Sequence, residues 1–473
     1  MVHKSPCSRG LVYMPPTKSN PSSPKEVSAR LQALWWLVAV SKDGRSVNDL
    51  LANHETYLVS TGEVAFAKQL LFGSLRYFHQ MTAILDQLLK KPLKQKDTDI
   101  FAILILGVYQ LRYLSVPDHA ALSQSVELTR KVNKSWASGF VNGVLRNYQR
   151  QTKEIDEKLA QAKTYRYSHP NWIINQLESD WPANAAAILD ANNQRAPMTL
   201  RVNQQKIGIE DYQQELVAEG LSSTKHPIAI DALILDTPCD VGKLPGFAAG
   251  LVTLQDAAAQ LTVELMDLQD GQRVLDGCAS PGGKTTHILQ RTKGVHLTSV
   301  EMSKQRMVKI EQTLQRLGMH SNLYCADILD TDSWWDGELF DRILIDVPCS
   351  ASGVIRRNPD IKIHRKKLDL AKLVSLQADI LNSCWELLKP GGRLVYATCS
   401  VFKSENEQQI EKFLAKQQAE TVLFPATIHS ALTGTQMSKL DLVNACSIGY
   451  QIFPGEENMD GFYLCGLEKD KIS

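Results

Sequence analysis

Apolar residues recur at three- and four-residue spacings through almost all of residues 25–165. The pattern is clear in EVAFAKQLLFGSLRYF, TDIFAILILGVYQLRYL and WASGFVNGVLRNYQR, and the alternation typical of strands is absent. Such spacing places the apolar side chains on one face of an α-helix. The sequence therefore predicts an all-helical bundle over residues 25–165.

The pattern changes after residue 165, where Tyr167–Pro170 and Arg195–Pro197 interrupt the chain. Two short strand-like runs, PMTLRVN and LILD, lie on either side of a helix-like stretch at Asp211–Glu219. We expect a small α+β connector over residues 166–245.

Strands and helices alternate in the last part of the chain, residues 246–470. The predicted strands are RVLDGCA, LTSVEM, NLYCAD, FDRILIDVPC, GGRLVYATCS and GFYLCGLE, and amphipathic stretches that predict helices lie between most of them. A long polar loop follows FDRILIDVPC. Alternating strands and helices indicate a parallel sheet with helices on both faces, and ligands bind such sheets beyond the carboxyl ends of the strands.

The composition is that of an ordinary globular protein, and the 473 residues are enough for two or three domains. The formal net charge is only +1, but it is unevenly distributed. Residues 25–165 contain 19 Lys and Arg against 13 Asp and Glu, whereas the chain beyond them is acidic overall. A mildly basic helical part fits a region that meets phosphate groups.

Nine cysteines are too few for a disulfide scaffold, and none forms the paired CxxC pattern of a zinc site, so we expect no metal. Residues 1–24 lack the apolar segment of a signal peptide and are rich in Pro and Ser, which predicts a disordered leader. No run reaches 18 apolar residues, so no membrane partner is expected. We expect a monomer in the reducing cytoplasm.

A glycine-rich motif, DGCASPGGKT, follows the first strand of the last domain and begins at Asp276. Gly282 and Gly283 allow a ligand to approach the backbone, and the helix that follows offers free N–H groups. A tight strand–helix turn is the plain alternative. The motif is not a phosphate-binding P-loop, because Gly277 lies six residues before Gly283 where five are required.

Three acidic residues, Glu301, Asp327 and Asp346, are predicted to end the next three strands. One such residue alone would be an ordinary surface acid. Three at the ligand edge of one sheet indicate a site for ribose hydroxyls and an exocyclic amine, as a nucleoside requires.

Two cysteines, Cys349 and Cys399, are predicted at the same edge, in the PCS and TCS tripeptides. Either alone would most often be an inert buried thiol. Together they fit nucleophilic catalysis, in which a thiolate adds to carbon 6 of a cytosine and makes carbon 5 able to attack a methyl sulfonium. After the transfer, the proton on carbon 5 has to leave, with help from a second thiol, a carboxylate or water.

Three blocks, CASPGGKTT, IDVPCSASGVIRRNPDIK and VYATCSVFKSENE, resemble the signature motifs of the Sun/Nop2/NSUN family of RNA cytosine-5 methyltransferases. The likeness extends over about residues 28–467 and is strongest to bacterial members that act on small-subunit (16S) ribosomal RNA. It implies a NusB-like RNA-binding helical domain, a connector and a Rossmann-like class I methyltransferase domain. It also implies S-adenosylmethionine as the methyl donor.

The resemblance assigns roles to individual residues. Cys399 matches the nucleophile, Cys349 a second cysteine that helps to release the product, Asp346 an acid that holds the cytosine near the cofactor, and Lys284 a lysine at the reaction centre. Glu301 matches the acid for the ribose, and Asp327 the acid near the adenine. The loop around the methionine part of the cofactor matches Cys278, Ala279, Ser280, Pro281, Gly282, Gly283 and Lys284.

The run IRRNPDIKIHRKK follows Cys349 and contains six Lys and Arg and one Asp. A solvated loop is the simpler interpretation, but its place beside the cysteine favours phosphate contacts by Arg356 and Arg357. Two other functions stay open. A DNA cytosine methyltransferase would use the cysteine of its PC dipeptide, here Cys349, as the nucleophile. A non-catalytic RNA-binding module would use the helical domain alone.

Overall fold

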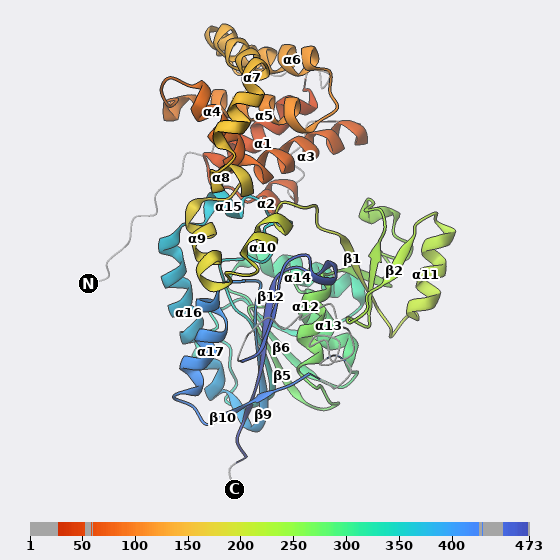
Figure 1. Cartoon of the computed structure of the whole chain (residues 1–473). Coiled ribbons are helices and arrows are strands. Elements are labelled where there is room, and N and C mark those ends of the chain that lie inside the picture. The colour runs from red at the N-terminus through yellow and green to blue at the C-terminus, as the bar shows by residue number, and fades with distance from the viewer. Residues whose placement is uncertain (1–26, 53–57, 59, 425–427, 429–447, 472–473) are drawn as a thin grey trace, which may run out of the picture. The chain divides into compact units, whose positions relative to one another are not determined.

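The computed structural model describes residues 27–52, 58, 60–424, 428 and 448–471 (Figure 1). The predicted leader, residues 1–24, lies outside the described residues. The chain folds into two compact units. The first comprises residues 1–175 together with 358–365, and the second comprises residues 176–357 and 366–473.

The first unit is a helical bundle, as the spacing of apolar residues predicts. Its central helix, α5 (Thr98–Tyr113), has apolar residues on every face. Its residues from Ala102 to Gln110 are all buried, as expected for a helix that is covered on every side. Gly73 allows a neighbouring helix to approach closely, because a Cβ there would lie 2.0 Å from the Tyr109 hydroxyl. The helices are α1 (Ala29–Ser41), α2 (Val47–Ala52), α3 (Thr61–Arg76), α4 (Phe78–Leu88), α5 (Thr98–Tyr113), α6 (Asp118–Lys131), α7 (Ser138–Leu159) and α8 (Lys163–Tyr167).

Residues 358–365, predicted as part of a polar loop, instead belong to this helical unit. They contain the short helix α15 (Ile361–His364). Lys362 is buried, and its ammonium donates to the carbonyl of Ser168 at 2.9 Å and to that of Arg76. The carboxylate of Asp360 accepts from the backbone N–H of Val47 at 3.3 Å. Eight of the thirteen residues of the basic run are therefore part of the bundle.

The second unit begins with the connector, which is α+β as predicted. Its four-stranded sheet has the order β2-β3-β1-β4, and β1 is antiparallel to both of its neighbours. Leu200, Leu233, Tyr212 and Leu216 form its core between sheet and helix. Helix α9 (Asn171–Asp180) crosses the boundary between the two units, which falls after residue 175. The elements that follow it are α10 (Ala185–Ala191), β1 (Met198–Val202), α11 (Ile209–Ala218), β2 (Ser223–Lys225), β3 (Ala232–Leu235) and β4 (Val252–Leu254).

The rest of the second unit is built on an eight-stranded mixed sheet. Its order is β10-β12-β9-β8-β5-β6-β7, and β11 pairs with β12. The predicted parallel part is present from β9 to β7, while β12 is antiparallel to β9. The strands are β5 (Arg273–Gly277), β6 (His296–Val300), β7 (Asn322–Tyr324), β8 (Phe340–Asp346), β9 (Leu388–Thr398), β10 (Ala419–Val422), β11 (Tyr450–Ile452) and β12 (Phe462–Lys469).

Helices cover both faces of this sheet, because successive side chains of each strand point to opposite sides. On β9, Val395 and Ala397 pack with the helices on one face, whereas Leu394 and Tyr396 pack with those on the other. Figure 1 shows α12 and α13 on the first face and α16 and α17 on the second. The helices are α12 (Ala257–Glu264), α13 (Gly283–Arg291), α14 (Lys304–Leu317), α16 (Lys367–Glu386) and α17 (Glu407–Leu414).

Among the described residues, no helix combines the length and the apolar character needed to cross a lipid bilayer.

Candidate active site

The carboxyl ends of four neighbouring parallel strands bring the predicted site residues to one edge of the sheet. Asp276 lies at the end of β5, Glu301 directly follows β6, Asp346 ends β8, and Cys399 directly follows β9. The pairing of the strands keeps these ends in register. Asp327 differs from the prediction, because β7 ends three residues earlier. Its carboxylate is exposed and accepts a hydrogen bond from the backbone N–H of Leu329 at 3.0 Å.

The seven loop residues predicted to surround the cofactor run consecutively from β5 into the first turn of α13. Cys278 has a φ of 65°, and Gly282 a φ of 93°. A side chain at Gly282 would meet the backbone of α14, since its Cβ would lie 3.2 Å from the Cα of Ile310. The N–H of Ala279 donates to the carbonyl of Val300 at 3.0 Å and anchors the loop. Glycine is required here for conformation and for space.

Asp276 is fully buried beneath this loop. One carboxylate oxygen accepts from the hydroxyl of Thr285 at 2.6 Å, and the other, Oδ1, has no hydrogen-bond partner among the described residues. Burial raises the pKa of Asp276 to about 7. Glu301 is also buried, and its carboxylate accepts from the N–H of Ser303 at 2.8 Å. The unfilled acceptor of Asp276 beside a glycine-rich loop suits a ligand with amino or hydroxyl groups.

Lys284 and Asp346 form an ion pair in the middle of the site. The Nζ of Lys284 lies 2.6 Å from Oδ2 of Asp346 and 5.1 Å from the ring centre of Phe462. Burial lowers the pKa of Lys284, but the Asp346 carboxylate and the nearby Cys399 thiol outweigh it, so that the pKa is raised overall. Lys284 is therefore a fixed positive charge beside a thiol.

The two predicted cysteines meet, with Sγ of Cys349 3.4 Å from Sγ of Cys399. Cys399 is partly exposed, whereas Cys349 is only 7% exposed. The hydrogen bond with Cys399 and burial raise the pKa of Cys349 well above its ordinary value. Gly353 donates to the carbonyl of Cys399 at 3.0 Å, and a Cβ at Gly353 would lie 2.1 Å from the Gly461 carbonyl oxygen. Cys399 is thus the accessible thiol of the pair.

Two other cysteines lie in the core of the sheet, away from this pair. Cys384 and Cys465 are buried in the apolar layer of the sheet, and burial raises the pKa of each to about 12. Cys446 lies outside the described residues.

Glu405 is a site residue that the sequence pattern did not reveal. It is 0% exposed, and it accepts hydrogen bonds from the N–H and hydroxyl of Ser350, the hydroxyl of Ser400 and the amide of Gln377. Ser350 and Ser400 each directly follow one of the two cysteines. Nothing in the local sequence marks Glu405, because its partners lie up to 55 residues away.

Arg201 of the connector is a second residue that the sequence analysis missed. Its buried guanidinium donates to the carbonyl of Gly283 at 2.6 Å and to the hydroxyl of Thr286 at 2.9 Å. Burial lowers its pKa to about 9. A signal was available, since an arginine inside the apolar run MTLRV has to be paired when that strand is buried. The connector therefore supports the start of α13.

Arg356 and Arg357, the predicted phosphate contacts, are engaged within the protein instead. Arg356 is 3% exposed, and its Nε lies 2.5 Å from the Asp460 carboxylate. Arg357 pairs with the same carboxylate and with Asp256 at 2.7 Å. These acids, about 100 residues away in sequence, neutralise both guanidinium groups, and phosphate binding by Arg356 and Arg357 stays a prediction.

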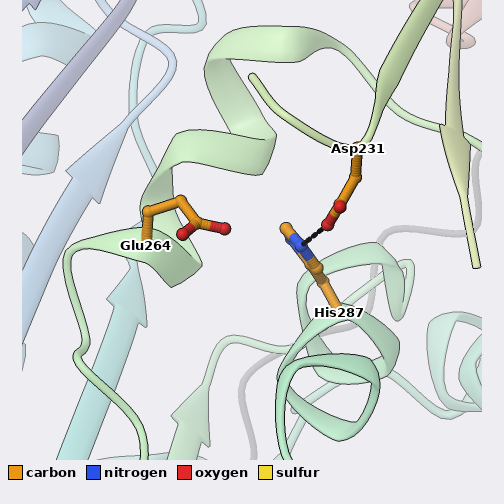
Figure 2. Close-up of side chains that lie close together, drawn as sticks. All are labelled: Asp231, Glu264 and His287. Carbon is orange, nitrogen blue, oxygen red and sulfur yellow. Dashed lines mark hydrogen bonds and ion pairs between the residues drawn. The ribbon is translucent and has the colours of Figure 1, made fainter. Parts of the chain in front are cut away.

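Three side chains of metal-ligand type, Asp231, Glu264 and His287, lie with one atom each within 4.8 Å of one another (Figure 2). Nε2 of His287 lies 3.2 Å from the Asp231 carboxylate, and burial lowers the pKa of His287 to about 3. Arg291 already supplies a positive charge, with a nitrogen 2.6 Å from Glu264 and another 3.7 Å from Asp231. This cluster ties the connector to α12 and α13, and the expectation of no metal stays a prediction.

A glycine-rich loop after the first strand, acids at the neighbouring strand ends and a sheet of this order define a Rossmann-like methyltransferase. Sequence comparison agrees. Residues 27–150 match the NusB family, residues 169–242 the ferredoxin-like domain of RsmF/B-like methyltransferases, and residues 263–468 the 16S rRNA methyltransferase RsmB/F family.

Ribosomal RNA small subunit methyltransferase B of Klebsiella pneumoniae (strain 342) is 40% identical over 444 residues, which are 94% of this chain and 99% of that protein. The protein of the same name from Vibrio vulnificus (strain YJ016) is 40% identical over 405 residues, or 86% and 91% of the two chains. The chain belongs to the RsmB/F family of 16S rRNA methyltransferases.

Solved structures show the same fold. The crystal structure of PH0851 has a TM-score of 0.74 at 20% identity and covers 93% of this chain and 99% of its own. A methyltransferase homolog from Pyrococcus horikoshii has a TM-score of 0.54 at 25% identity and covers 65% and 97%. The predicted architecture of a NusB-like bundle, a connector and a Rossmann-like methyltransferase domain is confirmed.

Proposed function

We propose that this protein transfers a methyl group from S-adenosylmethionine to carbon 5 of a cytosine in 16S ribosomal RNA, through a covalent bond between Cys399 and the base. The observation that carries the proposal is the accessible Cys399 thiol, which lies 3.4 Å from Cys349 and close enough to Lys284 to raise the pKa of that lysine. The family to which the chain belongs supports the RNA substrate.

The residues at the strand ends fit S-adenosylmethionine. The loop from Cys278 to Lys284 would surround the methionine part, Glu301 would hold the ribose, and Asp327 would approach the adenine. The unfilled oxygen of Asp276 offers an acceptor for an amino group. When bound, the cofactor supplies an electrophilic methyl group.

The chemistry follows from the cysteine. The Cys399 thiolate adds to carbon 6 of cytosine, which forms a carbon–sulfur bond and moves an electron pair to carbon 5. Carbon 5 would then take the methyl group of the bound donor, whose sulfur would keep the electron pair of the broken carbon–sulfur bond and become a neutral thioether. A base then removes the proton from carbon 5, and the thiolate leaves as the ring double bond re-forms. Asp346 holds the cytosine, Lys284 holds Asp346 at 2.6 Å, and Cys349 assists the release.

The NusB-like helical unit binds the rRNA in this proposal, and the target base is presented outside a stack, because its reactive atoms are covered within one. We place the protein in the cytoplasm as a monomer, and both remain predictions.

Trapping on RNA that contains 5-fluorocytosine tests the nucleophile, because fluorine at carbon 5 blocks the loss of a proton and keeps the adduct. We expect a stable protein–RNA adduct with the wild type and with Cys349→Ser, and none with Cys399→Ser. The opposite pattern would assign Cys349 as the nucleophile, as in a DNA methyltransferase. Bisulfite sequencing of 16S rRNA from cells carrying each variant identifies the modified cytosine.

A non-catalytic role makes a different prediction. If Cys399→Ser restores every function of the gene in cells that lack it, and the purified protein binds no S-adenosylmethionine, the chain acts as an RNA-binding module.

A further inference from the structure

With Arg356 and Arg357 engaged within the protein, the phosphates of the substrate need another partner. The helical unit contains a strongly basic segment, residues 128–153, with six Lys and Arg and no Asp or Glu. It covers the end of α6, the 3-10 turn η3 (Ser135–Ala137) and most of α7. This local excess of charge favours a polyanion.

One side of this segment carries exposed aromatic rings. Trp136 is 64% exposed and Phe140 is 37% exposed, although neither residue type is usual at the surface. Gly139 and Gly143 lie on the same side, and a Cβ at either would meet nothing within 4 Å. Two open rings with a bare backbone beside them can stack on bases of a single strand.

Arginines continue the same side along α7. Arg146 and Arg150 are exposed and follow the glycines at helical spacing. Their hydrogen bonds are to the side-chain amides of Asn142 and Asn147, at 3.2 Å and 3.4 Å. In the part of the chain that the structure describes, neither forms an ion pair with a carboxylate, so both can bind phosphate.

We propose that this side of α7, which we call the α7 face (Trp136, Gly139, Phe140, Gly143, Arg146 and Arg150), binds a single-stranded segment of the rRNA substrate. The rings stack on bases, and the two guanidinium groups pair with phosphates. The inference rests on the proposed function, because it names the RNA contact that this function requires.

Two double variants of the full-length protein test the α7 face, Trp136→Ala/Phe140→Ala and Arg146→Ala/Arg150→Ala. The matched control is Lys412→Ala/Lys416→Ala, which removes two exposed lysines of the same spacing in and just after α17. Binding to unmodified 16S rRNA is measured at several salt concentrations, together with kcat and KM for methylation.

We expect the aromatic variant to bind rRNA about tenfold or more weakly with the same salt dependence. The arginine variant should lose affinity and also lower the slope of log Kd against log salt concentration by about 1.5, as two lost phosphate contacts predict. Both variants should raise KM for RNA and leave kcat at saturating RNA unchanged. The control variant should match the wild type in every one of these measurements.

Wild-type affinity in both variants would overturn the assignment of the α7 face and leave the methyltransferase proposal intact; the face would then serve a protein partner. If the wild-type protein itself neither binds nor methylates 16S rRNA, the proposed function fails first.

A second observation concerns the catalytic cysteines. Glu405, in the 3-10 turn η6 (Lys403–Glu405), accepts four hydrogen bonds, and all four donors are neutral. Oε2 binds the hydroxyls of Ser350 at 2.6 Å and Ser400 at 2.5 Å, and Oε1 binds the N–H of Ser350 at 2.8 Å. A single carboxylate thus links the loop that follows β8 to the loop that follows β9.

Replacement of one oxygen by an amide group breaks this arrangement. Glutamine would present two N–H donors where Glu405 presents a second acceptor, and hydroxyls that are held by a carboxylate would have to turn. Because Ser350 and Ser400 are bonded to the cysteines, a shift of either moves a sulfur. The charge of Glu405 also adds to the Cys399 hydrogen bond and to burial in raising the pKa of Cys349.

We infer that Glu405 is a positioning residue that sets the distance between the Cys349 and Cys399 thiols for addition and release. This inference also rests on the proposed function. It predicts that the geometry of the cysteine pair, and not cofactor binding, depends on Glu405.

Glu405→Gln is compared with Glu386→Gln, an exposed glutamate at the end of α16. We expect Glu405→Gln to lower kcat about 100-fold with an unchanged KM for S-adenosylmethionine. The same variant should form the Cys349–Cys399 disulfide at least tenfold more slowly when it is treated with diamide. Glu405→Asp, which keeps the charge on a shorter arm, should recover part of both. A normal kcat would overturn the inference, and so would a lowered kcat with an unchanged rate of disulfide formation.

If Glu405→Gln does not fold, Ser400→Ala removes one of the four bonds and tests the same two readouts. Full activity of Cys399→Ala would instead refute the proposed function on which the inference rests.

Discussion

The Sγ atoms of Cys349 and Cys399 lie 3.4 Å apart although 50 residues separate them in the chain. The two cysteines follow β8 and β9, which are adjacent and parallel, with Asp346 opposite Ala397 in the last pair. Neighbouring parallel strands end at the same edge of a sheet, so the PCS and TCS tripeptides lie next to each other there. The two thiols form one chemical unit.

An oxidant should therefore join the two cysteines. Hydrogen peroxide oxidises the two thiols to a disulfide and is reduced to water, and the sulfurs have only to approach to about 2.05 Å. We expect loss of methylation, a mass lower by two hydrogens and full recovery with dithiothreitol. Cys349→Ser is the control, since it cannot form this bond. Oxidation of Cys399 to a sulfenic acid without the mass loss would contradict the prediction.

Arg356→Met should destabilise the protein without weakening RNA binding. It leaves the buried carboxylate of Asp460, whose pKa burial raises to about 6, with only part of its positive partners. Breaking a buried ion pair costs about 3 kcal/mol, which urea denaturation measures. Arg306→Met, which replaces an exposed residue of α14, should change little. A normal stability with a weaker affinity for rRNA would restore Arg356 as a phosphate contact.

Arg201→Met should weaken the binding of S-adenosylmethionine about tenfold and leave the KM for RNA unchanged. The substitution leaves the carbonyl of Gly283 and the hydroxyl of Thr286 without their buried donor at the start of the cofactor loop. Isothermal titration of the cofactor measures the effect. Lys225→Met, an exposed substitution in the same connector, is the matched control. Equal losses for cofactor and RNA would indicate general unfolding instead.

His287 should make stability fall as the solution becomes acidic. Burial lowers its pKa to about 3, whereas in the unfolded chain it is about 6.5. Below pH 6.5 the unfolded state therefore binds one more proton than the folded state. The free energy of unfolding then falls by about 1.4 kcal/mol per pH unit from this residue alone.

The check is urea denaturation of the wild type and of His287→Gln at pH 7.5, 6.5 and 5.5. The contribution is complete above pH 6.5 and is lost as the pH falls toward 3, so the wild type should show the steeper loss. Parallel curves for the two proteins would exclude the buried neutral state of His287.

The parts of the structure that depend on local pattern were predictable. The spacing of apolar residues in α5 and α7 and the alternation around β5, β6, β8 and β9 arise within single elements, and they indicated the bundle and the sheet. The meeting of Cys399 and Asp346 at one edge of the sheet was predictable, because parallel topology puts strand ends together. Short β7 was the exception, and its early end leaves Asp327 off the strand.

Interactions between distant segments could not be predicted. Arg357 and the acids that neutralise it, Asp256 and Asp460, are about 100 residues apart in sequence. A run of basic residues therefore looks like a phosphate site until its folded neighbours are known. Glu405 shows the converse. A glutamate is expected at the surface, but Glu405 is buried between the loops that follow Cys349 and Cys399.

Residues 358–365 belong to the helical unit although the chain on either side of them belongs to the catalytic unit, and this matters for any fragment made from the protein. Lys362 reaches the carbonyls of Arg76 and Ser168, which belong to the bundle. A fragment cut after residue 175 would retain this lysine and lose both acceptors. The catalytic unit therefore cannot be separated by a single cut. A shorter active version of the protein would also need new residues at positions 358–365.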